Sequence, residues 1–291
     1  MILYSHIFII RKITTMTNKT NSKSNSRSRH IYIYILLFGL LITASFLSVM
    51  LGSVYINPAD ILKCFFTPDK TSVTYILIMN IRLPRMLGAI IAGMGLSVAG
   101  VILQGVMNNA LASPNTIGVN SGAGFFVMLA MMLFPHSGYA TSIASFVGAL
   151  LTTLAIYALA YMADSSRTTI ILAGITVSSF LNAGINTIKL INTDITLNIT
   201  SFLMGTLSGL TFNKIALPAI GIIAAVLVSF ILAKPLNILS LGDDYARSLG
   251  LNVPLTRFFL LVLSSIMAGL CWPIKLHRSY CSSYMQDFIR K

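Results

Sequence analysis

The chain has 291 residues, of which 56% are hydrophobic and only 9% are charged. A soluble domain of this length would need far more surface charge, so the composition excludes a soluble enzyme and predicts a protein that meets lipid over most of its exterior. The formal net charge is +13, and ten of the 20 basic residues lie in the two end segments. This distribution is typical of tails beside an anionic membrane and not of a nucleic-acid-binding face.

Residues 1–30 form a basic N-terminal tail that we expect to be disordered. From Met16 onward the tail is rich in Asn, Ser and Lys (MTNKTNSKSNSRSR), a composition that cannot bury enough apolar surface to fold. Met16 is a better candidate than Met1 for the start of translation, and residues 1–15 are then upstream sequence read as protein. Their apolar stretch is too short to span a bilayer. No small-residue cleavage site follows the next apolar segment, so we interpret that segment as a retained anchor.

Seven apolar segments are candidate membrane helices, because a bilayer core needs about 20 apolar residues per helix. They predict an all-α, polytopic membrane bundle over residues 31–270. Small residues recur within them and let helix backbones approach closely. The segments are Ile31–Leu51, Met86–Met107, Ile117–Pro135, Tyr139–Met162, Thr169–Ile191, Ile215–Ala233 and Arg257–Leu270. The apolar stretch Thr200–Phe212 is too short to cross and predicts an interfacial or re-entrant helix.

The basic tail before the first segment predicts a cytoplasmic N-terminus by the positive-inside rule. Alternation then places the segment Lys234–Thr256 in the cytoplasm and the segment Gly52–Arg85 outside. Arg82 and Arg85, at the outer end of the second segment, go against this rule. On charge alone, an acidic partner and simple headgroup anchoring explain these two arginines equally well.

The sequence holds few residues suited to catalysis or metal binding. It contains no Glu and only four His, and Cys64, Cys271 and Cys281 form no CxxC pair. No GxxxxGK[ST] motif is present, so the chain cannot hold ATP in a P-loop. We therefore expect no catalytic residue, no metal and no cofactor, and we expect any ATP hydrolysis to belong to a partner.

Four stretches resemble the FecCD-type permeases of iron-siderophore and cobalamin ABC importers, in that family's order and spacing. They are IRLPRMLGAIIAGMGLSVAGVILQGVMNNALASPNTIGVNSGAG (Ile81–Gly124), TIILAGITVSSF (Thr169–Phe180), SFLMGTLSGLTF (Ser201–Phe212) and LNILSLGDDYARSLGLNV (Leu236–Val253). The resemblance runs over about Ile31–Gly269 and implies a bundle of about ten membrane helices. One departure is the sequence Asn-Ala-Leu-Ala at Asn109–Ala112, where the family usually has Asn-Pro-Leu-Ala, and we expect this change to soften a loop.

The resemblance implies roles for particular residues at the two membrane surfaces. In the family, the RLPR arginines pair with acidic residues of the substrate-binding protein, which favours docking as the role of Arg82 and Arg85. The Leu236–Val253 stretch resembles the cytoplasmic coupling helices, which seat in a groove of the ATPase. Two aspartates at a helix start with an arginine beyond them also suit a short helix matched to its dipole. The expected coupling residues are Leu241, Gly242, Asp243, Asp244, Arg247, Leu249 and Gly250.

The segment Thr169–Ile191 resembles the helix that lines the family's translocation path. Its polar side chains recur at helical spacing, which suits a wet cavity, but interhelical hydrogen bonding explains each of them equally well. The expected path residues are Ser178, Ser179, Asn182 and Asn186, and Arg167 and Thr168 fall where the family places its cytoplasmic gate.

The resemblance thus implies a permease in a bacterial plasma (inner) membrane that carries an iron-siderophore complex, or a related chelate such as haem or cobalamin, inward by ATP-driven alternating access. The expected partners are an identical or homologous permease, two ATP-binding subunits, an extracytoplasmic substrate-binding protein and the lipid bilayer, with no nucleic acid. An alternative is an ion-coupled secondary transporter. That function would need an acid inside the membrane, and none of the seven Asp lies in the middle of a segment.

After Gly269 the sequence departs from the family pattern, and residues 271–291 have no membrane segment and no periodicity. Read one nucleotide later, codons for Lys275–Asp287 permit Ser-Phe-Ile-Gly-Leu-Ile-Val-Pro-His-Ile-Cys-Arg, which resembles the motif expected there. We therefore expect an out-of-frame tail that follows a one-base slip shortly before Lys275, on a permease truncated to about seven helices. A second alternative follows: the chain is a non-functional product that fails to accumulate in membranes.

Overall fold

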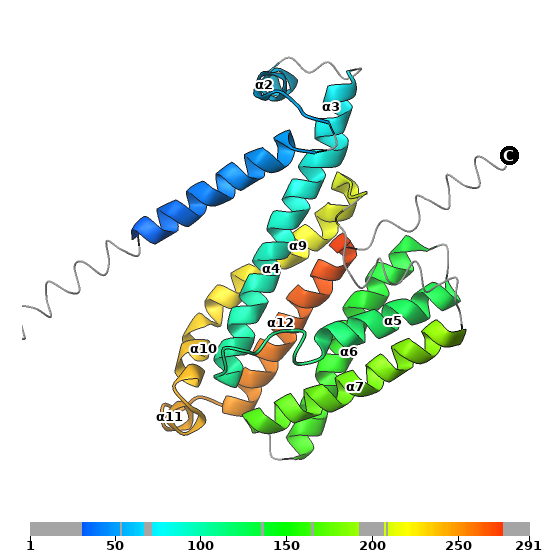
Figure 1. Ribbon diagram of the computed structural model, residues 1–291. Helices are drawn as coiled ribbons and strands as arrows, with labels where there is room; N and C mark the ends of the chain where they lie inside the picture. Colours follow the sequence, from blue (N-terminus) through cyan, green and yellow to red (C-terminus); the bar gives the residue numbers. More distant parts are fainter. Residues whose placement is uncertain are drawn as a thin grey trace, which may run out of the picture. The chain divides into compact units, whose positions relative to one another are not determined.

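The computed structural model describes residues 31–275, except for 53, 67–71, 135–136, 164–165, 192–206 and 208. Every regular element within the described residues is helical (Figure 1), which confirms the expected all-α fold. Six of the described helices are long and apolar enough to cross a membrane. They are Ile31–Met50, Val73–Met107, Ala140–Met162, Arg167–Ile191, Phe212–Ile231 and Val253–Cys271.

Several expectations concern residues outside this description. The predicted N-terminal tail lies wholly outside it, as do most of the predicted short helix Thr200–Phe212 and residues 276–291 of the expected out-of-frame tail. The last described helix, α12 (Val253–Lys275), begins before and ends after the predicted segment Arg257–Leu270.

The N-terminal unit, residues up to Tyr75, contains a long helix and a short one. The long helix, Ile31–Met50, has 20 residues and a mean hydropathy of 2.3, which is typical of a membrane span. The short helix, α2 (Pro58–Phe66), buries Ile61 and Cys64. Its first turn carries Asp60, and a negative charge at this end interacts favourably with the helix dipole.

The second membrane helix begins earlier than the predicted Met86. Three elements follow one another without a break: α3 (Val73–Leu77), the π-helical turn η1 (Ile78–Arg82) and α4 (Leu83–Met107). Pro84 cannot donate a backbone hydrogen bond, and the wider π-turn directly before α4 accommodates this loss. The helix therefore continues through Pro84 and both arginines, whereas the sequence predicted that the membrane segment would begin after them, at Met86.

In the second unit, α12 lies between two groups of helices (Figure 1). It packs against α4 and α9 (Phe212–Ile231) on one side, and against α5 (Val119–Leu133) and α6 (Gly138–Met162) on the other. The helix α7 (Arg167–Ile191) packs on α5 and α6. The predicted segment Ile117–Pro135 is represented by α5, whose 15 residues make it shorter than the six spanning helices.

Glycine lets α5 and α6 pack closely together. Gly122 of α5 faces Thr152 of α6, and a Cβ added at Gly148 of α6 would lie 2.7 Å from the Gly122 carbonyl oxygen. The backbones therefore touch at this crossing, which is the packing that small residues in membrane helices favour.

Candidate functional site

The predicted coupling stretch folds into two short helices between α9 and α12. They are α10 (Ala233–Ser240) and α11 (Asp243–Ser248). In α11, Asp243 and Asp244 lie in the first turn and Arg247 lies in the last turn. Negative charges near the N-terminus and a positive charge near the C-terminus stabilise the helix dipole. The short helix expected from these residues is thus confirmed.

Two glycines set the ends of α11. Gly242 precedes the helix with φ of 125° and Gly250 follows it with φ of 80°, and residues with a side chain rarely adopt positive φ. The Gly250 N–H donates to the Arg247 carbonyl at 2.9 Å, and the Leu251 N–H donates to the Ala246 carbonyl at 3.0 Å. This pair of bonds is the Schellman motif, which satisfies the last carbonyls of a helix.

Most side chains of α11 and its flanks are exposed. Tyr245 is 70% exposed, and Leu241 and Leu249, which flank the helix, are 65% and 64% exposed. Asp244 and Arg247 are exposed as well, and Ala246 is the buried residue of the helix. Large apolar side chains interspersed with charges on a short exposed helix suit contact with a protein partner.

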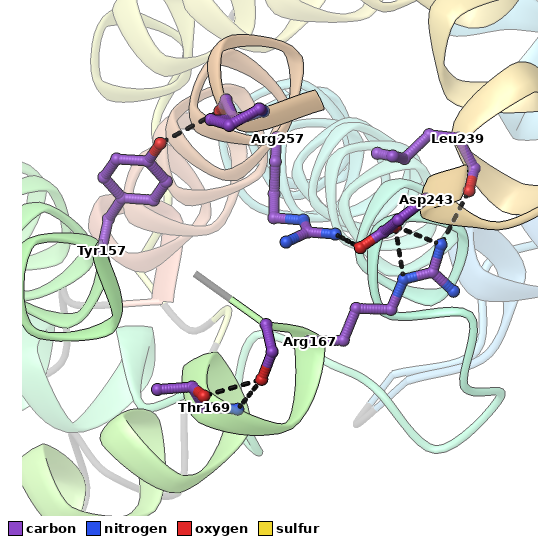
Figure 2. A network of polar contacts seen from close by, with 8 residues as sticks. Tyr157, Arg167, Thr169, Leu239, Asp243 and Arg257 are labelled. Atoms are coloured by element: carbon purple, nitrogen blue, oxygen red, sulfur yellow. Dashed lines mark hydrogen bonds and ion pairs between the residues drawn. The ribbon is translucent and has the colours of Figure 1, made fainter. Parts of the chain in front are cut away.

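Asp243 differs from its neighbours because it joins α11 to two other helices (Figure 2). Its Oδ1 accepts hydrogen bonds from Arg167 Nε at 3.1 Å and Nη2 at 2.8 Å, and its Oδ2 accepts one from Arg257 Nη2 at 2.7 Å. Arg167 is the first residue of α7, and Arg257 lies near the start of α12. Arg167 Nη2 also donates to the Leu239 carbonyl of α10 at 2.9 Å. We call Arg167, Asp243 and Arg257 the arginine clasp.

The arginine clasp is partly buried, so its charges are screened less by water than those of a surface ion pair. The Arg257 side chain is 2% exposed, and those of Arg167 and Asp243 are 18% and 28% exposed. Partial burial raises the pKa of Asp243, but the hydrogen bonds and charges of Arg257 and Arg167 outweigh it and hold that pKa below its ordinary value. Asp243 is therefore ionised at neutral pH. Removing Asp243 would leave the buried Arg257 guanidinium without its carboxylate partner, which is destabilising because a buried charge is left uncompensated.

Two residues of this region, Arg257 and Tyr157, were not predicted from the sequence. The Tyr157 hydroxyl of α6 donates to the Pro254 carbonyl of α12 at 3.0 Å (Figure 2), and its ring centroid lies 5.0 Å from that of Phe258. An arginine at the end of a predicted apolar helix can signal a buried partner. Arg257 gave that signal, but its partner lies on another helix and could not be named from spacing.

The two predicted path serines lie midway along α7 and bond within that helix. Ser178 Oγ donates to the Gly174 carbonyl at 2.7 Å, and Ser179 Oγ donates to the Ile175 carbonyl at 2.9 Å. These hydroxyls are satisfied by their own backbone, so they need neither water nor another helix to be stable in a membrane.

The two predicted path asparagines, Asn182 and Asn186, lie one turn apart on the exposed side of α7. Asn182 Nδ2 donates a long hydrogen bond of 3.4 Å to Ser121 Oγ of α5. Lipid offers no hydrogen-bond partner to an amide, so this side of α7 requires water or protein beside it. Of the two predicted gate residues, Thr168 is exposed, whereas Arg167 belongs to the arginine clasp. Among the described residues, no group of three His, Cys or acidic side chains could hold a metal.

The two predicted docking arginines are not equivalent. Arg82 ends η1 and is only 7% exposed, whereas Arg85 lies in the first turn of α4 and is exposed. A partner protein can therefore reach Arg85 more readily than Arg82.

Side-chain hydrogen bonds hold the loop after α4, where this chain has Ala110 in place of the proline usual in the resembling family. Asn109 Oδ1 accepts from the Leu111 N–H at 2.9 Å. Thr116 Oγ1 accepts from the Ser113 N–H at 2.8 Å, and Ser113 Oγ accepts from the Thr116 N–H at 3.2 Å. Such turns fix a loop conformation without proline.

Comparison with known proteins gives consistent matches over most of the chain. The model of the FecCD transport family matches residues 40–274. The probable siderophore transport system permease protein YfhA of Bacillus subtilis is 33% identical over 244 residues, which cover 81% of this chain and 71% of the relative. The Fe(3+)-citrate import system permease protein YfmE of the same organism is 31% identical, with the same coverage of both chains. The solved structure of a metal-chelate type ABC transporter in an inward-facing conformation is 26% identical, has a TM-score of 0.72, and is matched over 84% of this chain and 75% of that chain.

Proposed function

The chain belongs to the FecCD transport family, and on that premise we propose that it is the membrane-spanning permease subunit of an ABC importer for iron-siderophore complexes. The observation that supports this function best is the exposed helix α11, which lies beside the ends of the membrane helices and is linked to α7 by an ion pair. The similarity to permeases named for siderophore and Fe(3+)-citrate transport favours an iron chelate as cargo. Membership of this family disfavours the ion-coupled secondary transporter.

The partner at α11 is an ATP-binding subunit, one for each of two permeases. The exposed residues Leu241, Tyr245 and Leu249 supply apolar contact area, and Asp244 and Arg247 supply charges that fix the orientation of the partner. The permease contributes no covalent chemistry, and the ATPase supplies the energy.

A substrate-binding protein docks at the opposite side of the membrane, at Arg85. Gly105, near the other end of α4, lies against the Leu236 side chain of α10. Arg85 and Gly105 are separated by about 30 Å along the helix at 1.5 Å per residue, which is about the thickness of the hydrocarbon core. With α10 and α11 in the cytoplasm, Arg85 faces outward and the N-terminus is cytoplasmic, in agreement with the positive-inside rule.

The exposed side of α7 lines the translocation path, next to a second permease that is identical or homologous. Asn182 and Asn186 need water or protein beside them, and a path between two subunits provides both. ATP-driven movement at α11 then changes the side of the membrane to which this path opens.

Uptake by proteoliposomes tests the proposal directly. The chain is co-purified with the ATP-binding subunit and the binding protein of its own cell, and uptake of an ⁵⁵Fe-loaded siderophore is measured with ATP inside or absent. We expect uptake that requires ATP and the binding protein and that stops with a hydrolysis-deficient ATPase. Uptake driven by a proton or sodium gradient without ATP would refute an ABC importer, and uptake of haem but not of the ferric siderophore would refute the cargo.

A further inference from the structure

We infer that the arginine clasp makes α11 and the adjacent ends of α7 and α12 move as one unit, so that a displacement imposed on α11 reaches α7 through Asp243 and Arg167. The inference rests on the proposed function only for the roles of α11 as the ATPase-docking helix and of α7 as the path helix. The joint movement of these elements is a property of this chain alone and can be measured without any partner.

The geometry of Asp243 supports this link. Its two carboxylate oxygens are divided between two helices: Oδ1 accepts both bonds from Arg167 of α7, and Oδ2 accepts the bond from Arg257 of α12 (Figure 2). Arg167 is further fixed by its bond to the Leu239 carbonyl of α10. One side chain of α11 thus binds the ends of two membrane helices. The planar guanidinium of Arg167 donates two hydrogen bonds to Asp243, which restricts the orientation of the carboxylate relative to α7.

The helix α11 is too short to keep its position by itself. It has six residues, and an isolated helix needs at least about 12 to be even marginally stable in water. It packs on α10 and α12, mainly through buried Ala246, and it turns sharply at Gly242 and Gly250 on either side. The bonds of Arg167 are what carry its position across to α7.

Arg167 therefore acts as a positioning residue rather than as part of the gate surface. Its guanidinium points toward Asp243 and α10 (Figure 2). If the clasp were only a static brace, its loss would lower stability and would lower transport and ATP hydrolysis together. A mechanical link predicts a different result, because hydrolysis would continue without productive movement of α7.

Spin-label distances test the joint movement on the full chain in lipid nanodiscs. Nitroxides are attached at Leu172 of α7 and Tyr245 of α11, both well exposed, in a background without the native cysteines. We expect a single narrow distance in the parent, and a clearly broader distribution in Arg167→Gln, which leaves the Asp243–Arg257 pair in place. Lys234→Gln removes an exposed cation from α10 and should leave the distance narrow. An equally narrow distance in Arg167→Gln would overturn the inference.

A transport measurement tests the consequence for coupling. In proteoliposomes with the ATPase and the binding protein, Arg167→Gln should still recruit the ATPase, but should lower the amount of ⁵⁵Fe-siderophore taken up per ATP hydrolysed by about tenfold, a change typical of lost coupling between two sites. Asp243→Glu, which keeps the carboxylate, should recover part of the ratio that Asp243→Asn loses. A parallel fall in uptake and hydrolysis would identify a static brace and refute the link. If the parent chain itself shows no ATP-dependent uptake, the proposed function fails, and the spin-label distances still decide on the clasp.

Discussion

The crossing of α5 and α6 allows a sharp test of the packing, through the substitution Gly148→Ala. A Cβ at Gly148 would lie 2.7 Å from both the Gly122 carbonyl oxygen and the Phe126 Cβ. Both distances are 0.7 Å short of the 3.4 Å at which ordinary van der Waals contact begins. One obstacle is backbone and the other is the first atom of a side chain, so neither can rotate away and the helices must separate.

The expected cost follows from this separation. Overpacking a close-packed contact costs about 1–3 kcal/mol. In water, replacing glycine by alanine within a helix would return about 1 kcal/mol through helix propensity. A membrane segment must stay helical even when it is separated from its neighbours, because lipid satisfies no backbone group. The propensity gain is therefore small here, and we expect a net loss of about 1–3 kcal/mol.

Unfolding of the purified chain in lipid nanodiscs, followed by steric trapping, measures this loss. Gly93→Ala is the matched control, because Gly93 lies in a membrane helix, α4, and a Cβ there would meet nothing within 4 Å. We expect the control to retain the stability of the parent. The reasoning is refuted if Gly148→Ala is as stable as the parent, or if Gly93→Ala loses as much stability as Gly148→Ala.

Three further predictions concern the proposed functional surfaces. Arg85→Glu should lower the association rate of the binding protein about tenfold at low salt. In stopped-flow binding, the difference between the variant and the parent should shrink as ionic strength rises. A loss that does not depend on salt would contradict docking by charge. Asn186→Leu should lower ⁵⁵Fe-siderophore uptake. The control Ser229→Ala in α9 should not, because the Ser229 hydroxyl donates to the Val226 carbonyl of its own helix at 2.6 Å. Equal uptake by both variants would contradict a water-filled path along α7. Because both arginines of the clasp hold the pKa of Asp243 below its ordinary value, the stabilisation by the clasp is complete above the unfolded pKa and is lost only as the pH falls through the folded pKa. The distance between α7 and α11 should therefore stay narrow down to about pH 4, and broadening near about pH 6 would be the contrary result.

Local chemistry was sufficient to predict much of this molecule. Hydropathy over about 20 residues predicts a membrane helix because the bilayer thickness fixes the length that must be apolar. The charge order of Asp243, Asp244 and Arg247 predicted a short helix in the correct place, since the effect of charge on the helix dipole acts within the first and last turns.

The remaining features depend on contacts between segments far apart in the chain. The continuation of the second membrane helix back to Val73 depends on a π-turn that no local composition signals. The burial of Arg82 and the exposure of Arg85 follow from tertiary position, although the two residues share one motif. The arginine clasp could not be predicted because Arg167 and Asp243 are 76 residues apart and meet only when three helix ends converge.

Few of the described residues attach α11 to the rest of the permease. The helix is bounded by two glycine turns, and within the described part of the chain Ala246 is its buried residue and Asp243 carries the hydrogen bonds to Arg167 of α7. The other side chains of the helix are exposed, and substitutions at such positions usually change stability little. On the proposed docking of an ATP-binding subunit at α11, a change of partner requires changes at the exposed positions of this helix, while Asp243, Ala246, Gly242 and Gly250 are kept.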